Sequence, residues 1–205
     1  MLDRRHALRF ALAGLVGAGT AGRAATAAPS AGERLNQPGP EAARLAARTG
    51  RWLVTETAWD GPDAAPATTT GLIADRVMIG TLLQETIRPS GEPGARTPSR
   101  TDLLSFNRLE GRWDYVSFDT RGPDGIMVAW SRGRGENDTV AFDFLPFAIP
   151  RPGPDAVGQF LRLDQVIRFV DDDHDVKEQF LTFADGSGTR WLGHRYGYAR
   201  VGGRS

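Results

Sequence analysis

Apolar and polar residues alternate along most of the chain after Gly50, and this period of two predicts β-strands. One clear case is the segment 160–170, in which four apolar residues share a face: Leu161, Leu163, Ile167 and Phe169. The same pattern along the whole chain predicts these strands: Arg51–Trp59, Thr68–Ile79, Thr81–Arg88, Arg100–Leu109, Arg112–Thr120, Ile126–Arg132, Thr139–Phe147, Phe160–Val170, Asp175–Phe183 and Arg190–Val201.

Most segments between the predicted strands are short turns rich in glycine, proline and aspartate, such as Asp60-Gly61-Pro62. A parallel crossover needs about a dozen residues or more, so strands joined by such turns must pair antiparallel. About ten antiparallel strands are expected to close into a barrel, because closure leaves no unpaired sheet edge. We therefore predict an all-β fold in which residues 41–205 form a single antiparallel barrel.

The N-terminal residues have a different pattern, which is typical of an export signal. Residues 1–28 combine Arg4 and Arg5 with a weakly apolar stretch and small residues at the expected cleavage point. The arginine pair resembles a twin-arginine signal, and the alternatives are an ordinary secretory signal or an uncleaved membrane anchor. Residues 29–40 are expected to form a flexible leader before a short helix at Glu41–Thr49. The predicted location is the periplasm or the exterior of the cell.

Composition narrows the functions of the predicted barrel. The chain has 25 basic and 25 acidic residues and no cysteine, which excludes disulfides, thiolate metal ligands and a cysteine nucleophile. Removal of the signal would take away four arginines and one aspartate, and the resulting negative charge argues against nucleic acid as a partner. Nearly all basic residues are arginine, and Lys177 is the only lysine. Beyond the signal, we expect no membrane span.

A short helix followed by Gly50-Arg51-Trp52 at the start of the first strand resembles the beginning of lipocalins and other calycins. The resemblance implies that Trp52 closes one end of the barrel beneath an arginine of the last strand, for which Arg195 and Arg200 are the candidates. The positions of glycine and aromatic residues also resemble DUF1579, a family of uncharacterised bacterial proteins, in four stretches: Leu45–Trp52, Thr70–Thr86, Leu103–Trp130 and Trp191–Tyr198. This second resemblance implies a lipocalin-like barrel and no particular activity.

Two histidines remain after the predicted signal, and their surroundings differ. His174 follows three aspartates in a segment between two strands, which favours a solvated turn over a metal site. His194 shares one face of the last strand with Leu192, Tyr196 and Tyr198 if the alternation is regular. Such a set, pointing into the barrel, could anchor the polar group of a ligand or transfer a proton.

Carboxylates on the predicted strands are the possible partners of His194. Glu56 and Glu178 are the candidates for an acid–base pair with it, because either one would be strongly perturbed if buried beside the imidazole. The strand register, which the sequence leaves open, decides between them. The abundant arginines are expected to engage the strand carboxylates in surface ion pairs of little energy; the other members of this set are Glu85, Asp102, Asp114 and Asp143.

Three functions fit this sequence. The first is binding of a small apolar or amphipathic ligand inside the barrel, against candidate lining residues Trp113, Tyr115, Phe142, Phe144 and Tyr196. The second is a barrel enzyme, such as an isomerase, cyclase or hydrolase, in which His194 acts with Glu56 or Glu178. The third is an accessory protein that binds a protein partner through its outer aromatic face. No cofactor and no metal is predicted for any of them.

Overall fold

The structure is a computed structural model that describes residues 28–91, 98–122, 125–148 and 160–202. Two short helices come first, α1 (Ala31–Asn36) and α2 (Pro40–Ala46). The strands are β1 (Gly50–Ala58), β2 (Ala67–Ile79), β3 (Leu82–Pro89), β4 (Arg100–Asn107), β5 (Arg112–Asp119), β6 (Ile126–Ser131), β7 (Thr139–Phe144), β8 (Phe147–Ala148), β9 (Phe160–Phe169), β10 (His174–Phe183) and β11 (Arg190–Arg200). The predicted strands agree with these bounds to within two residues, except that the segment predicted at 139–147 is divided into β7 and β8.

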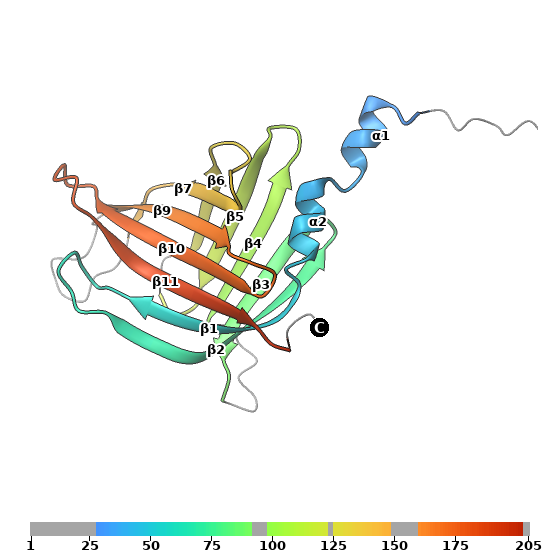
Figure 1. Ribbon diagram of the computed structural model, residues 1–205. Helices are drawn as coiled ribbons and strands as arrows, with labels where there is room; N and C mark the ends of the chain where they lie inside the picture. Colours follow the sequence, from blue (N-terminus) through green and yellow to red (C-terminus); the bar gives the residue numbers. More distant parts are fainter. Residues whose placement is uncertain (1–27, 92–97, 123–124, 149–159, 203–205) are drawn as a thin grey trace, which may run out of the picture.

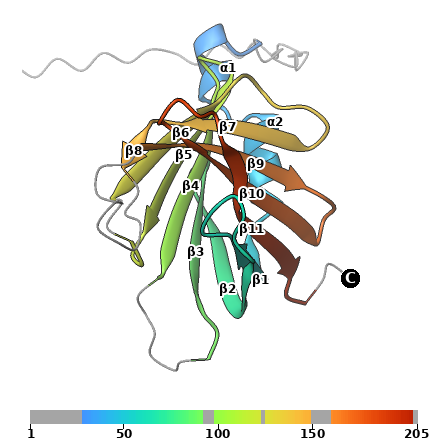
Figure 2. The same cartoon turned by 90° about the vertical axis from the view of Figure 1, so that its left-hand side faces the viewer.

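The strands form one antiparallel sheet that closes on itself (Figure 1). Its order is β10-β11-β1-β2-β3-β4-β5-β6-β7-β9-β8, and an additional pairing between β9 and β10 completes the barrel. The two-residue strand β8 pairs with β9 beside the end of β7, so ten strands make up the wall. Figure 2 shows how strongly these strands tilt across one another, as closure of a barrel requires. The all-β barrel predicted from the alternation is confirmed.

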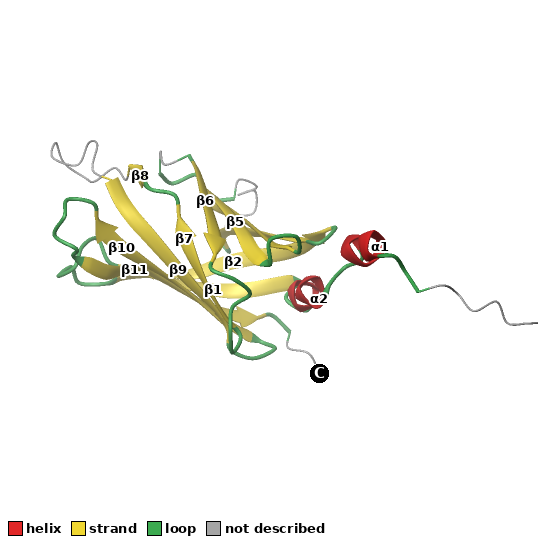
Figure 3. Ribbon diagram, turned by 90° about the horizontal axis from the view of Figure 1, so that it is seen from above, coloured by secondary structure: helices red, strands yellow, loops and turns green. Residues whose placement is uncertain are grey.

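The two ends of the barrel differ. Helix α2 lies against one end (Figure 3), where Leu45 is completely buried in the apolar core. The opposite end carries the β1–β2 and β10–β11 turns and is called the mouth below. Helix α1 lies within the predicted leader; Ser30 and Glu33 form a capping box at its start, and none of its residues is buried. No helix in the described part of the chain is long and apolar enough to cross a membrane.

Trp52 closes the barrel at the end covered by α2. Its side chain is completely buried, and its indole Nε1 donates a hydrogen bond of 3.1 Å to the backbone oxygen of Arg48. The guanidinium of Arg200 lies 4.3 Å from the centre of the indole ring and donates hydrogen bonds to two backbone oxygens of the α2–β1 connection. Gly50 permits the turn into β1, because its φ of +112° disfavours any residue with a Cβ atom.

Of the two candidates, the arginine above Trp52 is therefore Arg200, and Arg195 does not take this place. Arg195 lies on the outer face of β11, where its guanidinium donates hydrogen bonds of 2.6 and 2.9 Å to Glu178. Both arginines belong to the last strand, so the sequence resemblance alone could not distinguish them. The side of the strand on which each residue lies decides the matter.

A bulge in β11 changes which residues face the interior. The register of the β10–β11 pairing shifts at Gly193, so that Trp191 lies opposite Leu181 and His194 lies opposite Gln179. Trp191 and His194 consequently both face inward, whereas regular alternation predicts opposite faces for them. A Cβ atom on Gly193 would come within 2.6 Å of the Leu181 side chain, which explains why glycine occupies the bulge.

Candidate functional site

The interior of the barrel contains buried charges among its apolar side chains. On β3, Glu85 points inward between Leu83 and Ile87, and it is only 6% exposed. On β4, Arg100 and Asp102 occupy inward positions in the same way and are equally well buried. Charges removed from water are tolerated only when opposite charges and hydrogen bonds compensate them. Each of these buried charged groups must therefore have an ion-pair or hydrogen-bond partner inside the barrel.

The ion pairs that balance these buried charges begin beside α2. The Arg48 guanidinium lies 3.2 Å from a carboxylate oxygen of Asp175. The other oxygen of Asp175 accepts a hydrogen bond of 2.5 Å from Arg76, and Arg76 also donates one of 2.6 Å to Glu85. All four side chains come from different elements, because Asp175 lies on β10, Arg76 on β2 and Glu85 on β3. They hold the closed end of the barrel together from the inside.

Lys177 continues this arrangement at the centre of the barrel. Its ammonium donates hydrogen bonds of 3.2 Å to Glu85 and of 2.5 Å to Asp102. Asp102 also accepts hydrogen bonds from Arg100 at 2.9 Å and from Ser117 at 2.6 Å. The single lysine of the chain is thus a buried bridge between two carboxylates on neighbouring strands β3 and β4.

The same succession of charges reaches the mouth. Arg100 donates a hydrogen bond of 3.0 Å to the Tyr196 hydroxyl, which in turn donates one of 2.7 Å to Glu56. Glu56 also accepts hydrogen bonds of 2.7 and 3.3 Å from Arg121, and the His194 Nδ1 atom lies 3.3 Å from its Oε1 atom. We call the whole series the charge chain: Arg48, Asp175, Arg76, Glu85, Lys177, Asp102, Arg100, Tyr196, Glu56, Arg121 and His194.

Protonation along the charge chain follows from these contacts. Burial alone would raise the pKa of Glu56, but the nearby His194 and the hydrogen bonds from Arg121 and Tyr196 outweigh burial and hold that pKa well below its ordinary value. Burial likewise opposes ionisation of Glu85 and Asp102, yet the adjacent cations lower the pKa of both carboxyl groups. Asp175 differs, because burial outweighs its two arginines and its pKa is raised. Glu56, Glu85 and Asp102 are therefore ionised at neutral pH.

A small cavity lies against the centre of the charge chain. It has a volume of about 40 Å³, and its lining includes Lys177, Glu85, Asp102 and Tyr115. A polar cavity needs roughly 10–15 Å³ to hold one water molecule, so this space suits a few waters and no larger molecule. Any larger ligand that uses the barrel must bind nearer to the mouth or displace interior side chains.

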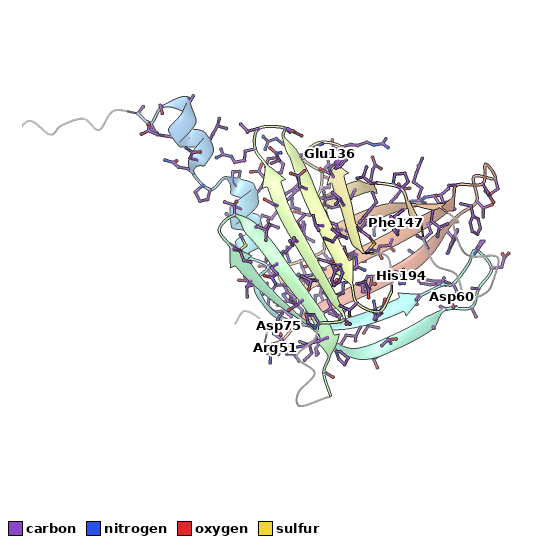
Figure 4. All side chains as sticks on the ribbon, turned by 180° about the vertical axis from the view of Figure 1, so that it is seen from behind. Arg51, Asp60, Asp75, Glu136, Phe147 and His194 are labelled. Carbon is purple, nitrogen blue, oxygen red and sulfur yellow. The ribbon has the colours of Figure 1, made fainter. Side chains whose placement is uncertain are left out.

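The mouth has an apolar arc beside the polar end of the charge chain. Phe147, Leu161 and Phe183 lie side by side across β8, β9 and β10. The ring of Phe183 lies 4.8 Å from that of Trp191, whose indole donates a hydrogen bond of 3.3 Å to the backbone oxygen of Trp59. We call these five residues the apolar arc. Figure 4 shows Phe147, His194 and Asp60 toward the same end of the barrel, away from Arg51 and Asp75.

His194 joins the apolar arc to the charge chain. Its Nδ1 atom is buried against Glu56, whereas its side chain as a whole is 36% exposed. The exposed part of the ring therefore includes atoms other than Nδ1. The imidazole also stacks on the Tyr196 ring at 6.0 Å, with an angle of 14° between the planes. This geometry fixes the ring while a part of it stays accessible at the mouth, where it can accept or donate a hydrogen bond.

The structure brings His194 and Glu56 together and keeps Glu178 away from them. Glu178 lies on the outer face of β10, where Arg168 and Arg195 pair with it. The expectation of weak surface ion pairs fits Asp114 and Asp143, whose side chains are 44% and 41% exposed. It is wrong for Glu56, Glu85 and Asp102, which point inward. The sequence carries a signal for these three residues, because each carboxylate occupies a position that alternation assigns to the apolar, inward face of its strand.

The five residues predicted to line a ligand site all lie on the inner face of the barrel and are buried: Trp113, Tyr115, Phe142, Phe144 and Tyr196. Tyr115 packs against both Phe142 and Phe144, with ring centres 5.4 and 5.6 Å apart. Only Tyr196 contacts the group around His194. The other histidine, His174, is the exposed first residue of β10, and its Nδ1 atom is 2.9 Å from a carboxylate oxygen of Asp171 in the preceding turn. The described residues contain no cluster of three potential metal ligands.

Comparison with known proteins supports the fold. The crystal structure of Rv2717c from M. tuberculosis is similar to this barrel, with a TM-score of 0.53 and 14% sequence identity. The match covers 80% of this chain and 99% of that one. At this level of identity the likeness concerns the barrel architecture alone. No family model matches the chain, and a search of curated proteins finds no match.

Proposed function

We propose that the protein binds a small amphipathic molecule at the mouth of its barrel, with the apolar body on the apolar arc and the polar group at His194. The observation that carries this proposal is the position of one partly exposed imidazole, fixed by buried Glu56, beside half-buried aromatic rings. Binding sites for small molecules combine a mainly apolar lining with a few oriented polar groups. The mouth offers both, whereas the centre of the barrel is occupied by the charge chain.

Binding can be measured with 1-anilinonaphthalene-8-sulfonate, an amphipathic fluorescent probe, in the wild type and in His194→Ala. We expect the dissociation constant to rise about tenfold in the variant, the effect of one lost hydrogen bond of about 1.4 kcal/mol. His174→Ala is the matched control, because it removes the other histidine from an exposed position at the start of β10, and its affinity should equal that of the wild type. Equal affinity in all three proteins would refute the role of His194.

The pairing of His194 with ionised Glu56 also favours a second candidate, an acid–base enzyme. In such an enzyme Glu56 would orient the imidazole and the imidazole would carry the proton, since the low pKa of Glu56 makes that carboxylate a poor base. A binder and an enzyme differ in what the His194→Ala protein retains. The binder would lose its ligand, whereas the enzyme variant would hold an unconverted substrate that differs in mass from any molecule held by the wild type.

We further propose that the chain is exported through a signal in residues 1–28 and belongs with DUF1579-like barrels. The sequence of those residues supports export, and all of them except residue 28 lie outside the described part of the structure. Native mass spectrometry of protein recovered from the periplasm tests export and binding together. We expect a chain shortened by the signal and a stoichiometric small molecule released on denaturation. Recovery of the full-length chain from the cytoplasm alone would contradict export, and it would leave the binding measurement above unaffected.

A further inference from the structure

The outer wall formed by β4, β5 and β6 is unusually apolar. Register places Phe118 opposite Ile126 and Val116 opposite both Leu103 and Val128. Side chains directly opposite each other on neighbouring strands share a face and touch, so these residues form a continuous surface. Trp130 and Leu145 extend it along and beyond β6. We call this surface the apolar wall: Leu103, Val116, Phe118, Ile126, Val128, Trp130 and Leu145.

Exposure of the apolar wall is substantial. Ile126 is 70% exposed, Leu145 49% and Phe118 44%. Single exposed apolar residues are common on proteins, whereas contiguous patches mark surfaces that bind something. The outer face of β9 to β11 is different, because arginines and carboxylates cover it, including the Arg168–Glu178–Arg195 group. One side of the barrel is thus hydrated, and the other is suited to a dry contact.

The charges at the border of the apolar wall indicate its partner. Arg112 lies over the Trp130 ring at 5.0 Å and pairs with Asp114 at 3.3 Å. On the other side of Trp130, Arg132 pairs with Asp143 at 2.5 Å. Arg112 also pairs with Glu110 at 2.7 Å, so this border carries two cations and three anions, all of them in ion pairs. A border that mixes both signs in this way can face its own copy across a two-fold axis. A partner of one net charge would be expected to select a border of the opposite charge.

We propose that the apolar wall is the interface of a homodimer in which β4, β5 and β6 of two copies pack face to face. The composition matches such an interface, with aromatic and branched apolar residues at the centre and paired charges, including arginine, at the border. The mouth remains open in this arrangement, because the apolar wall lies on the side of the barrel. The dimer is therefore independent of ligand binding.

Sedimentation equilibrium of the whole protein tests the proposal. We expect a dimer for the wild type at micromolar concentration. In the variant Phe118→Glu/Ile126→Glu the dissociation constant should rise by about 100-fold or more, since burial of four unpaired carboxylates per dimer is costly. The matched control is Val77→Glu/Ile79→Glu on the outer face of β2, where the two residues are 52% and 56% exposed. This control should remain dimeric.

Two results would overturn the proposal. One is a wild type that stays monomeric throughout the concentration series, including a monomer that co-sediments with phosphatidylglycerol vesicles. The other is a dimer that survives Phe118→Glu/Ile126→Glu. Circular dichroism and thermal unfolding show whether that variant is folded. If it is not, Val128→Arg provides a second measurement at a single residue, because an unpaired guanidinium at the centre of the interface should also dissociate the dimer, whereas Val77→Arg should stay dimeric.

Discussion

Replacement of Lys177 by methionine is expected to lower the free energy of unfolding by about 3–5 kcal/mol, the cost of removing one partner from a buried ion pair. The Lys177 ammonium bridges Glu85 and Asp102, and all three side chains are less than 10% exposed. Methionine has nearly the same length, so packing is kept and the charge is lost. Two carboxylates would then share the buried centre with one cation fewer. Urea unfolding followed by tryptophan fluorescence measures the difference.

A matched control for this variant is Arg195→Met on the neighbouring strand. Arg195 also pairs with a carboxylate that has a second cation, but its side chain is 53% exposed, so the expected loss is under about 1 kcal/mol. The double variant Lys177→Met/Asp102→Asn removes one charge of each sign. It should therefore cost less than the sum of the two single variants. Equal, small losses for Lys177→Met and Arg195→Met would contradict the description of the charge chain.

Acid is expected to destabilise the protein by at least about 3 kcal/mol between pH 7 and pH 3, the scale of one strongly paired carboxylate. Glu56, Glu85 and Asp102 all have a lowered pKa in the folded protein. A carboxyl group with a lowered pKa contributes stability above its unfolded pKa of about 4 and loses that contribution as the pH falls toward its folded pKa. Asp175 has the opposite effect, because its folded pKa is raised. Its contribution to stability increases as the pH falls and offsets a part of the stability lost at the other three groups.

Urea unfolding at a series of pH values measures this dependence. The Asp102→Asn variant is the comparison, because it removes one of the three interior carboxyl groups whose pKa is lowered in the folded protein. Its free energy of unfolding should fall less steeply than that of the wild type between pH 5 and pH 3, whatever its value at pH 7. A free energy that stays level down to pH 3 in the wild type would be inconsistent with ionised carboxylates buried inside the barrel.

The fold could be predicted from the sequence because its strands are regular. Alternation on strands such as β9 shows the inward face directly, and short turns leave antiparallel pairing as the only choice. The prediction for β11 was wrong at Leu192 and Trp191, since the bulge at Gly193 shifts the alternation by one residue. A glycine within a strand is the signal for such a shift, but only the register of the neighbouring strand shows where the strand resumes.

The candidate site was harder to predict, because barrel closure assembles it. His194 and Glu56 were both named as candidates, but Glu178 was equally plausible until the register was known. Lys177 and Asp102 lie 75 residues apart in sequence and meet only because β10 and β4 face each other across the interior. Local patterns could have identified the inward position of Asp102, since it alternates with Leu104 and Phe106. Local patterns could not have identified Lys177 as the cation that pairs with Asp102.

The burial of Lys177 has a practical consequence for chemical modification. It is the only lysine in the chain, and its side chain is 4% exposed and doubly paired with carboxylates. Acylating reagents such as succinimidyl esters require an accessible, unprotonated amine, which Lys177 does not offer in the folded barrel, so the α-amino group of the chain is the expected site of reaction. A dye or affinity label should therefore attach at one defined position. Labelling of Lys177 should begin only when the barrel opens, so the appearance of a second label would report unfolding directly.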